Sequence, residues 1–529
     1  AAAVIEFVEK PTSDARKVVL GYPVPLPVAS QTPVDGFRDY LSLLGRLRDL
    51  ALSSNFMAEN KLGTTMADRD INGFVLSDLD SLTAEGFAEP AMLINGGIHA
   101  REWASPEVVT AVAERLVERE GDTGFHRYLL ENTKAVVIPV LNVDGFLQTQ
   151  RYPALTLQTE FSGDPQGVNY PRDGRMQRKN MRDKDENLCA ADDSGCVVRD
   201  GMNGVDPNRN HAPLWATSTR SSFDPRSLVY HGSDRASENE SQALYAAARL
   251  AGEARLRFYT DVHSFSRIFF AANTGNARRD GIQQSLVNVM RAVTSNRYGY
   301  DPTPAGVGIG STDEYFAYTY NIPAYTLEIE PGPNGAQDYG APGYHHDGFI
   351  LPEAQIARVR DELTEVLLLG VYRMAGPPSI RAVEISETAG GAVVFRGTWN
   401  RVDESARRFD ISLNSGLRNE VDYTVWVAFN KPMRVRDGAG NIAQYRGQNI
   451  PLAPSLTLEV LDAGGAERIV SATSSTSGWR SASGAAPNGR LLYAEDAYQA
   501  QIRIPAALNL AGARRIALAV DAQDLSGQK

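Results

Sequence analysis

Cysteine, long apolar runs and excess positive charge are all scarce in this chain. Only 2 of its 529 residues are cysteine, and two cysteines alone cannot make a structural zinc site. The longest apolar stretches, Ala135–Leu141 and Val366–Tyr372, are far shorter than the roughly 20 residues that span a bilayer. The net charge of -11 argues against nucleic acid or an anionic membrane as the main partner. We therefore expect a soluble protein that acts on small molecules, peptides or proteins.

The two cysteines, Cys189 and Cys196, lie 7 positions apart in a stretch rich in Gly and Asp. Closing so short a loop stabilises a fold by only about 2.5 kcal/mol. We expect a disulfide rather than two free thiols, as is usual in exported proteins. The sequence opens Ala-Ala-Ala-Val without an initiator Met, as a chain trimmed of a signal peptide or prosegment would. These features predict a secreted or periplasmic location.

The length of the chain exceeds one ordinary core, so two domains are expected. In residues 36–376 short apolar runs alternate with helical patterns, which predicts an α/β fold with a mixed, largely parallel sheet and helices on both faces. The predicted strands are Ala91–Ile94, Lys134–Val143, Arg255–His263 and Pro323–Glu330. The predicted helices are Ser105–Glu118, with Ser105 as N-cap, Glu240–Glu253, Gly281–Ser295 and Pro352–Met374.

The pattern changes after Gly376-Pro377-Pro378. Short segments that alternate apolar and polar residues, separated by Gly, Asn and Asp, predict an all-β sandwich domain. We expect three parts: an N-terminal extension (1–35), a large α/β domain (36–376) and a C-terminal β domain (377–529). The predicted strands of the β domain are Ala392–Phe395, Arg408–Leu413, Tyr423–Phe429, Ser455–Leu461, Tyr498–Ile504 and Arg515–Val520.

Half of a metal site stands directly after the first predicted strand. His99 and Glu102 are separated by a single turn of chain, and imidazole with carboxylate is a ligand set that zinc accepts. Alone, such a pair is more often a surface hydrogen bond. Of the 7 histidines, His263 also ends a predicted strand, where it could equally be a buried hydrogen-bonded residue or the third ligand.

The sequence around these residues resembles the zinc carboxypeptidases of the carboxypeptidase A type. The resemblance covers most of residues 36–375, and eight short matches occur in family order. They are Gly97-Ile98-His99-Ala100-Arg101-Glu102-Trp103, Pro139-Val140-Leu141-Asn142-Val143-Asp144-Gly145-Phe146, Arg175-Met176-Gln177-Arg178-Lys179-Asn180, Gly204-Val205-Asp206-Pro207-Asn208-Arg209-Asn210, Val262-His263-Ser264-Phe265-Ser266, Gly310-Ser311-Thr312-Asp313, Tyr325-Thr326-Leu327-Glu328-Ile329 and Gly348-Phe349-Ile350-Leu351-Pro352.

The resemblance implies a carboxypeptidase that removes the C-terminal residue of a peptide by attack of a zinc-bound water. One zinc ion per chain would be held by His99, Glu102 and His263, which leaves one position for water. Glu328 would be the general base. Glu330, two residues further along the same strand, would point to the same face and competes for this role. The Thr-x-Glu pattern of the family favours Glu328.

The family pattern also implies roles for a group of polar residues. Arg178 would stabilise the developing oxyanion, and Asn208 with Arg209 would bind the terminal carboxylate of the substrate, which an arginine fork suits. Asp206 would accept a hydrogen bond from the far nitrogen of His99 and fix its tautomer. Arg101 would contact substrate residues further from the scissile bond.

The chain departs from the family in the loop before Asp313. The family has a mobile tyrosine there that caps the bound substrate. Pro304–Ile309 contains no tyrosine, so the sequence does not identify the residue that takes over this role. Thr312 occupies the position that helps to select the substrate side chain, with Asp313 beside it. Because Thr312 is neither acidic nor large and apolar, a basic C-terminal residue is disfavoured and a neutral one is preferred.

The interval from His99 to His263 is 164 residues, longer than the family norm. We place the excess in residues 156–171 and 183–201, as surface insertions. The run Asp183–Asn187 spaces carboxylates as calcium loops do, yet it lacks the following Gly and distal Glu of an EF-hand. A solvated acidic loop is therefore preferred over a Ca²⁺ site.

Two other functions fit parts of the sequence. A cell-wall peptide amidase or a side-chain glutamate peptidase would keep the metal site and change the substrate. A non-catalytic binding protein would use the β domain on a dead peptidase fold. Retention of Asn208 and Arg209 favours peptide or protein C-termini as partners, and the sequence leaves the oligomeric state open.

Overall fold

A computed structural model provides the structure of the chain, and most of the α/β region and the C-terminal strands are described. Residues 1–35, Cys189, Cys196 and Asp183–Asn187 lie outside the described residues, so the N-terminal extension, the disulfide and the acidic calcium-like loop stay predictions. The described residues are 36–82, 88–121, 125–151, 177–182, 204–225, 227–291, 294, 300–332, 349, 351–374, 380–398, 408–429, 444–445, 448–449, 455–471, 473–479 and 497–521.

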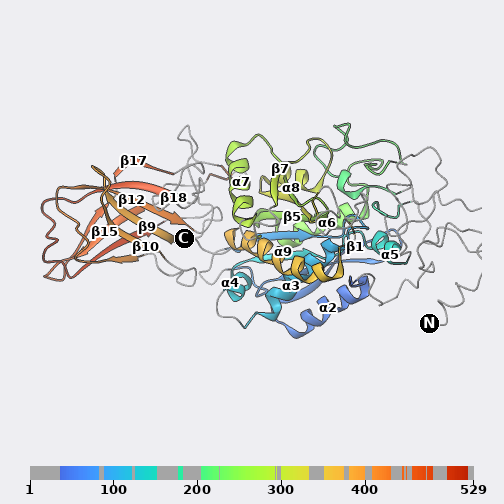
Figure 1. Cartoon of the computed structure of the whole chain (residues 1–529), viewed down its shortest axis with the longest axis horizontal. Coiled ribbons are helices and arrows are strands. Elements are labelled where there is room, and N and C mark those ends of the chain that lie inside the picture. Colours follow the sequence, from blue (N-terminus) through green and yellow to red (C-terminus); the bar gives the residue numbers. More distant parts are fainter. Residues whose placement is uncertain are drawn as a thin grey trace, which may run out of the picture.

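An eight-stranded sheet with the order β1-β2-β4-β3-β5-β8-β6-β7 forms the centre of the larger region (Figure 1). Its inner strands β4, β3, β5 and β8 are parallel, while β1, β2 and the pair β6/β8 add antiparallel contacts. This confirms the predicted mixed, largely parallel sheet. The strands are β1 Met57–Thr64, β2 Asp70–Leu76, β3 Ala91–Asn95, β4 Lys134–Ile138, β5 Leu256–Ser264, β6 Ile268–Ala271, β7 Asp301–Pro304 and β8 Ala324–Ile329.

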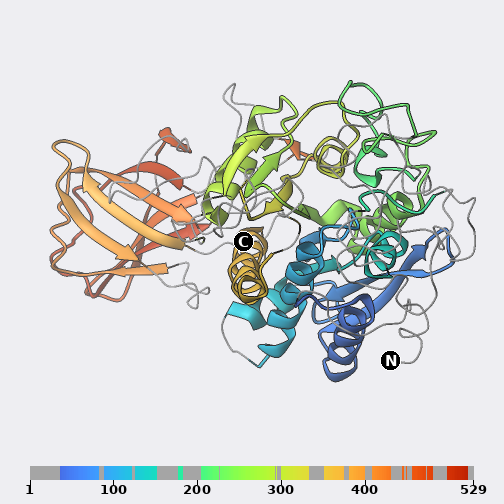
Figure 2. The ribbon, with the colours of Figure 1, turned by 45° about the vertical axis from the view of Figure 1, so that its right-hand side comes forward.

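Helices cover both faces of this sheet (Figure 2). Helix α3 packs against α9, α2 and β5, whereas α6 packs against β1 to β4. The four predicted helices all exist, with ends shifted by at most four residues. The helices are α2 Tyr40–Ser53, α3 Ala104–Glu118, α4 Phe125–Asn132, α5 Val143–Arg151, α6 Asn239–Ala251, α7 Ala277–Arg291, α8 Thr312–Tyr320 and α9 Glu353–Met374.

Two predicted boundaries were wrong for identifiable reasons. The strand predicted to reach Val143 ends at Ile138, because Pro139 lacks an N–H for the ladder and the following residues bond to the loop after β3 instead. Ser105 is not the N-cap of α3; it lies inside the first turn. Its hydroxyl accepts a hydrogen bond from the Gly97 backbone (2.9 Å) and donates one to the Glu102 carbonyl (3.1 Å), so it ties the start of α3 to the loop that carries the metal motif.

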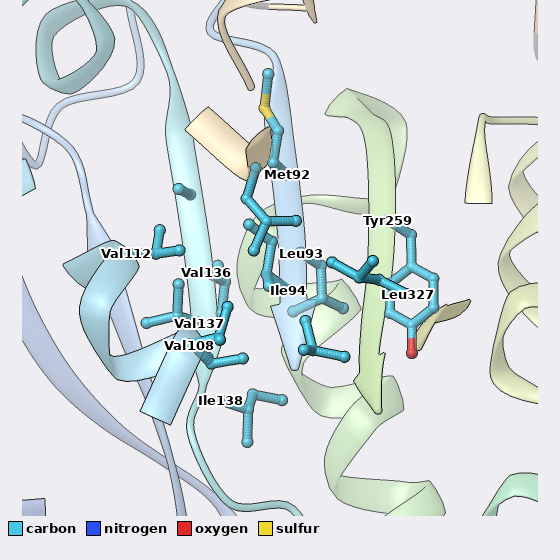
Figure 3. Close-up of a cluster of buried hydrophobic side chains, with 14 of the residues drawn as sticks. Met92, Leu93, Ile94, Val108, Val112, Val136, Val137, Ile138, Tyr259 and Leu327 are labelled. Atoms are coloured by element: carbon cyan, nitrogen blue, oxygen red, sulfur yellow. The ribbon is translucent and has the colours of Figure 1, made fainter. Parts of the chain in front are cut away.

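The core of the larger region surrounds β3 (Figure 3). A parallel strand in the centre of a sheet is buried on both faces, which explains its uninterrupted apolar sequence. Helix α3 covers one face, and the neighbouring strands complete the packing. Side chains of this cluster, all fully buried, are Met92, Leu93, Ile94, Val108, Val112, Val136, Val137, Ile138, Tyr259 and Leu327. Burial on this scale holds the carboxyl ends of β3 and β5 in a fixed relation.

The C-terminal region consists of antiparallel strands, as predicted. Sheets of the orders β10-β9-β12-β18-β17 and β11-β19-β15-β16 share one hydrophobic core, and β13 pairs with β14. The pattern did not reveal β9, β16 or β17. The strands are β9 Ile380–Glu387, β10 Val393–Thr398, β11 Arg408–Ile411, β12 Asp422–Phe429, β13 Gln444–Tyr445, β14 Gln448–Asn449, β15 Ser455–Leu461, β16 Glu467–Ser471, β17 Thr473–Trp479, β18 Ala497–Arg503 and β19 Arg515–Asp521.

No helix in the described part of the chain is both long enough and apolar enough to cross a membrane.

Candidate active site

The site forms where two neighbouring parallel strands end. His99 follows β3, and His263 lies near the end of β5, which pairs with β3. The Glu102 backbone N–H donates to the His99 carbonyl (3.2 Å), so one turn separates the two side chains as predicted. Gly97, at φ +61°, allows this loop to pass close to the residues that follow β4. A Cβ on Gly97 would lie 3.0 Å from the Val140 Cα.

The three predicted metal ligands converge. His99 Nδ1 lies 2.8 Å from Glu102 Oε1, and His263 Nδ1 lies 3.0 Å from Glu102 Oε2. The two Nδ1 atoms are 3.0 Å apart. All three side chains are buried, and one ligand atom from each lies within 4.8 Å of the others. These residues therefore present a compact set of two nitrogens and a carboxylate.

A carboxylate stands behind each imidazole. Asp206 Oδ1 is 3.1 Å from His99 Nε2, which is the contact predicted from the sequence, and Asp261 Oδ2 is 2.8 Å from His263 Nε2. Each carboxylate accepts the Nε2–H of its histidine, which leaves both Nδ1 lone pairs facing the Glu102 carboxylate. Three electron-pair donors that face one another need a cation between them. The donor set is the His₂Glu set of catalytic zinc sites.

Asp261 was missed at the level of sequence. It lies two residues before His263 in β5, hence on the same face of the strand, and that spacing was the available signal. Asn95 Nδ2 donates to Asp261 Oδ1 (2.7 Å), and the Thr312 hydroxyl donates to Asp261 Oδ2 (2.8 Å). The support of the second histidine is therefore assembled from three segments that lie far apart in the chain.

Glu328 faces this centre from β8. The register of the parallel pair β5/β8 sets Glu328 beside His263. Its Oε2 is buried without a hydrogen-bond partner. Burial, and next the negative charge of Glu102, raise the pKa of Glu328 to about 7. Its competitor Glu330 instead forms an ion pair with Arg358 of α9, so the two strand carboxylates differ in surroundings.

Three of the predicted substrate residues lie beside the metal ligands. Arg178 donates from Nε and Nη2 to Asp206 Oδ2 (3.1 and 2.9 Å), and its Nη1 lies 3.8 Å from Glu102 Oε1. Asn208 and Arg209 sit in the 3₁₀ turn that Asp206 caps through the Asn208 N–H (2.9 Å). Arg209 donates Nη1 to the Asn208 carbonyl (2.7 Å) and has no carboxylate within ion-pair distance among the described residues.

A cavity joins these side chains. The residues that line it are His99, Arg178, Asn208, Arg209, Arg220, Phe270, Ala305, Gly306, Ile309, Ser311, Asp313, Thr326 and Glu328. One predicted metal ligand, the carboxylate of Glu328 on β8 and three arginines thus share a single space with the loop that lacks the family's tyrosine. A space of this kind can admit a peptide end, because it offers both cationic and carboxylate groups.

A family model described as zinc carboxypeptidase matches residues 46–366, more than half of the chain. The chain belongs to the zinc carboxypeptidase family. Membership of this family places the chain among the metal-dependent peptide hydrolases, and the His-Glu-His set fits the zinc that the family name implies.

Relatives of the chain carry carboxypeptidase names. It is similar to carboxypeptidase B of Astacus astacus, with 26% identity over 53% of this chain and 79% of that protein. It is also similar to carboxypeptidase A4 of Mus musculus, with 26% identity over 57% of this chain and 61% of that protein. The crystal structure of carboxypeptidase A from Helicoverpa armigera superposes with a TM-score of 0.47 at 20% identity, over 70% of this chain and 77% of that one. Family membership rests on the sequence match.

Within this zinc carboxypeptidase site, two predicted specificity residues take different positions. Asp313 lines the cavity, and burial raises its pKa to about 6. Thr312 does not line it. Its backbone N–H donates to Asn208 Oδ1 (2.9 Å) and its hydroxyl to Asp261. Both polar groups of Thr312 thus hold other residues of the site, and its part in selecting the substrate side chain stays a prediction.

The cavity also contains residues that the sequence did not single out. Arg220 comes from the segment after the 3₁₀ turn, and its Nη1 lies 2.7 Å from where a Cβ on Gly306 would stand. Phe270 and Thr326 enter from β6 and β8. No motif marks Arg220, since only the fold brings it to the Pro304–Ile309 loop.

Arg101 lies outside the lining of this cavity. Its guanidinium stacks 4.3 Å from the centroid of the Phe349 ring. Burial, and next the charge of Arg178, lower the pKa of Arg101 to about 10. The described contacts therefore give Arg101 a packing partner, and its predicted contact with distant substrate residues stays a prediction.

Proposed function

We propose that this chain is a zinc-dependent carboxypeptidase that hydrolyses the C-terminal residue of peptides. The observation that carries the proposal is the shared cavity, in which the metal ligand His99, the buried carboxylate of Glu328 and the guanidinium of Arg209 face one space. Hydrolysis needs the metal ligand His99 and the carboxylate of Glu328, and a preference for the C-terminal residue needs the guanidinium of Arg209.

His99, Glu102 and His263 would hold the zinc ion. When bound, zinc lowers the pKa of a water ligand to about 7 and polarises a carbonyl group. Glu328, whose Oε2 has no protein partner, would accept the proton of the attacking water and pass it to the leaving amine. Arg178 would donate hydrogen bonds to the developing oxyanion, with Asp206 holding its guanidinium in place.

Asn208 and Arg209 would bind the terminal carboxylate of the substrate. Arg209 carries a guanidinium with a free Nε and no carboxylate partner among the described residues, which suits a paired hydrogen bond to a carboxylate. Asn208 is held by the Thr312 backbone. Because these groups stand at a fixed distance from Glu328, only the last peptide bond would reach the base.

A neutral C-terminal residue fits the rest of the cavity. Phe270, Ala305 and Ile309 provide apolar contact. The positive charge of Arg220 opposes a lysine or arginine side chain. Arg220 therefore adds to the preference against basic residues that the sequence predicted from Thr312.

The rival substrates keep the same metal site. A peptide amidase or a side-chain glutamate peptidase would not need a carboxylate site of the Asn208 and Arg209 type, so an ordinary free α-carboxylate is favoured. A non-catalytic binding protein would not need a buried carboxylate such as Glu328 beside the ligands. No observation favours these alternatives.

We also propose how the chain is divided into parts and where the protein is located. Residues 1–35 would be an extension, 36–376 the catalytic domain and 377–529 an accessory β-sandwich. A secreted or periplasmic location, with Cys189 joined to Cys196, follows from the sequence alone.

Hydrolysis of blocked dipeptides with a free C-terminus tests the function directly. We expect activity that a chelator abolishes and added Zn²⁺ restores. In Glu328→Gln we expect kcat to fall about 10²- to 10⁴-fold, the usual contribution of a general base, with zinc content unchanged. Glu330→Gln, directly after the end of β8, is the matched control and should keep kcat within a few fold.

Full activity in Glu328→Gln would show that another group is the base. If no peptide with a free C-terminus were cut while amidated or isopeptide substrates were, the rival substrates would replace the proposal. A panel that varies only the last residue tests the pocket, and preference for Lys or Arg would contradict the role given to Arg220.

A further inference from the structure

A second group of carboxylates lies at the opposite end of β3 from the active site. Asp78 and Asp80 follow β2, and Glu89 stands two residues before β3. Since His99 follows the far end of β3, the six residue-to-residue steps from Glu89 to Asn95 set the two sites about 20 Å apart along the strand direction. The catalytic assignment uses none of these three acids.

The chain brings the three side chains together for topological reasons. Strand β2 runs antiparallel to β4, so its end returns to the amino ends of the parallel strands. The Glu89 backbone N–H donates to the Ser81 carbonyl (3.2 Å), and the Asp78 N–H donates to the Leu130 carbonyl (2.9 Å). One carboxylate oxygen from each of the three acids lies within 4.8 Å of the others.

Glu89 is the feature that needs explanation. The residue is 0% exposed, and neither of its carboxylate oxygens has a hydrogen-bond partner. A buried polar group without partners is costly, and an ionised one more so. Burial, and next the charges of Asp78 and Asp80, raise the pKa of Glu89 to about 8. Glu89 is thus directed into the cluster with its bonding capacity unused.

Two basic residues approach the cluster without satisfying it. Arg255 donates Nη1 to the Ser81 carbonyl (3.4 Å), and Lys134 opens β4 beside it. Burial, and next the charge of Arg255, lower the pKa of Lys134. Neither residue forms an ion pair with Glu89. Their positive charge lowers the repulsion among the acids but leaves both Glu89 oxygens available as ligands.

We propose that Asp78, Asp80 and Glu89 bind a divalent cation, Ca²⁺, separate from the catalytic zinc. Three carboxylates without imidazole or thiolate are the donors of a hard cation. Ca²⁺ takes six to eight oxygens in a flexible arrangement, whereas Mg²⁺ demands near-ideal octahedral geometry. Asp80 is exposed and Asp78 half-buried, so the ion reaches the site from solvent and water completes its shell.

Bound Ca²⁺ would fasten the segment after β2 to the start of β3. The direct test is calorimetric titration of the full chain, loaded with zinc and freed of other metals, with CaCl₂. We expect one Ca²⁺ per chain and a melting temperature that rises with Ca²⁺ concentration by mass action. In Asp80→Asn, whose side chain is exposed, we expect Ca²⁺ affinity to fall at least tenfold while kcat stays unchanged.

Asp410→Asn, at an exposed aspartate of β11 outside the cluster, is the matched control and should bind Ca²⁺ as the parent does. Glu89→Gln tests whether Glu89 binds Ca²⁺ as a carboxylate or is simply a protonated, buried side chain. Loss of Ca²⁺ binding in this variant supports the site. Absence of Ca²⁺ binding to the parent chain, or equal binding by Asp80→Asn and Glu89→Gln, would overturn it. Zinc content and kcat are measured in parallel on the same samples. The presence or absence of Ca²⁺ binding is therefore distinguished from success or failure of the zinc reaction.

Discussion

Each predicted histidine ligand is oriented by an aspartate on its far side. Asp206 holds His99 and Asp261 holds His263, although they come from a 3₁₀ turn and a strand. A carboxylate in this position fixes the tautomer and raises the basicity of the ligand nitrogen. The two contacts decide that both Nδ1 atoms face Glu102, so the metal site depends on residues that never touch the metal.

Replacement of Asp261 by Asn tests this dependence. We expect the zinc affinity of Asp261→Asn to fall about 10- to 100-fold, the usual effect of removing such a partner, as measured by competition with a chromogenic chelator. Thr312→Val is the matched control, since it removes only the hydroxyl that donates to Asp261, and should weaken zinc binding less. Equal affinity in Asp261→Asn and the parent chain would contradict the role of Asp261.

At the scale of elements, one ion-pair network joins three helices. Arg38, just before α2, contacts Glu107 and Glu114 of α3 at 2.7 and 2.8 Å. Arg360 of α9 pairs with Glu114 as well. Glu107 is only 3% exposed, and Arg38 donates hydrogen bonds to its carboxylate. The network fixes α3, whose first turn follows directly after the ligand Glu102.

Removal of the Arg38 side chain should therefore lower the stability of this helix layer. We expect Arg38→Ala to lower the free energy of unfolding by about 3 kcal/mol, because it leaves a buried carboxylate without its main partner. The measurement is urea unfolding followed by circular dichroism. Arg48→Ala provides the comparison: Arg48 is 47% exposed in its pair with Glu59, and its loss should change stability by less than about 1 kcal/mol. Similar losses in both variants would refute the argument.

At the scale of the whole molecule, the described residues form two large, separate hydrophobic cores and one small cluster of Ala382, Trp426 and Ala428. One extends from Phe37 to Met374 and the other from Ile380 to Val520, and they share no residue. The active site uses only the first. This division supports the proposal that the β-sandwich is accessory.

A chain that ends at residue 376 tests that proposal. We expect it to fold and to keep kcat/KM for a blocked dipeptide within a few fold of the full chain, because every site residue lies in the first core or its loops. Cooperative thermal unfolding would establish that it folds. A folded but inactive product would show that the β region contributes to the site.

The stability of the whole chain should also depend on pH through Glu240. Burial raises the pKa of Glu240, at the start of α6, to about 7 from the ordinary 4.5. The folded state then binds a proton that the unfolded state has released, so this group's contribution falls as pH rises from about 4.5 to 7 and is constant above. The Asn180 amide donates to Glu240 Oε2 (3.0 Å), a bond that Gln can still accept.

Glu240→Gln should remove this dependence. We expect its stability relative to the parent to increase between pH 5 and pH 8, as measured from urea midpoints at each pH. Asn239→Gln is the control next in the helix and should show no such trend. A constant difference across this range would mean that Glu240 does not titrate there.

The sequence by itself determined the parallel centre of the sheet, and its resemblance to the family predicted the zinc ligands. Apolar runs as short as Ala91–Ile94 favour strands buried on both faces, and the His-x-x-Glu pair after one of them is a local feature of the sequence. The order of the eight motifs determined the family. Each strand and each motif is formed by residues near one another in the chain.

The tertiary structure alone decided which distant residues meet. Asp261 with Thr312, Arg220 with the Pro304–Ile309 loop, and Glu89 with Asp78 are brought together by strand order and chain return. It also joins the Thr312 hydroxyl to Asp261 and pairs Glu330 with Arg358. Such contacts carry no local pattern, because the free energy that selects them comes from burial and pairing across the whole sheet.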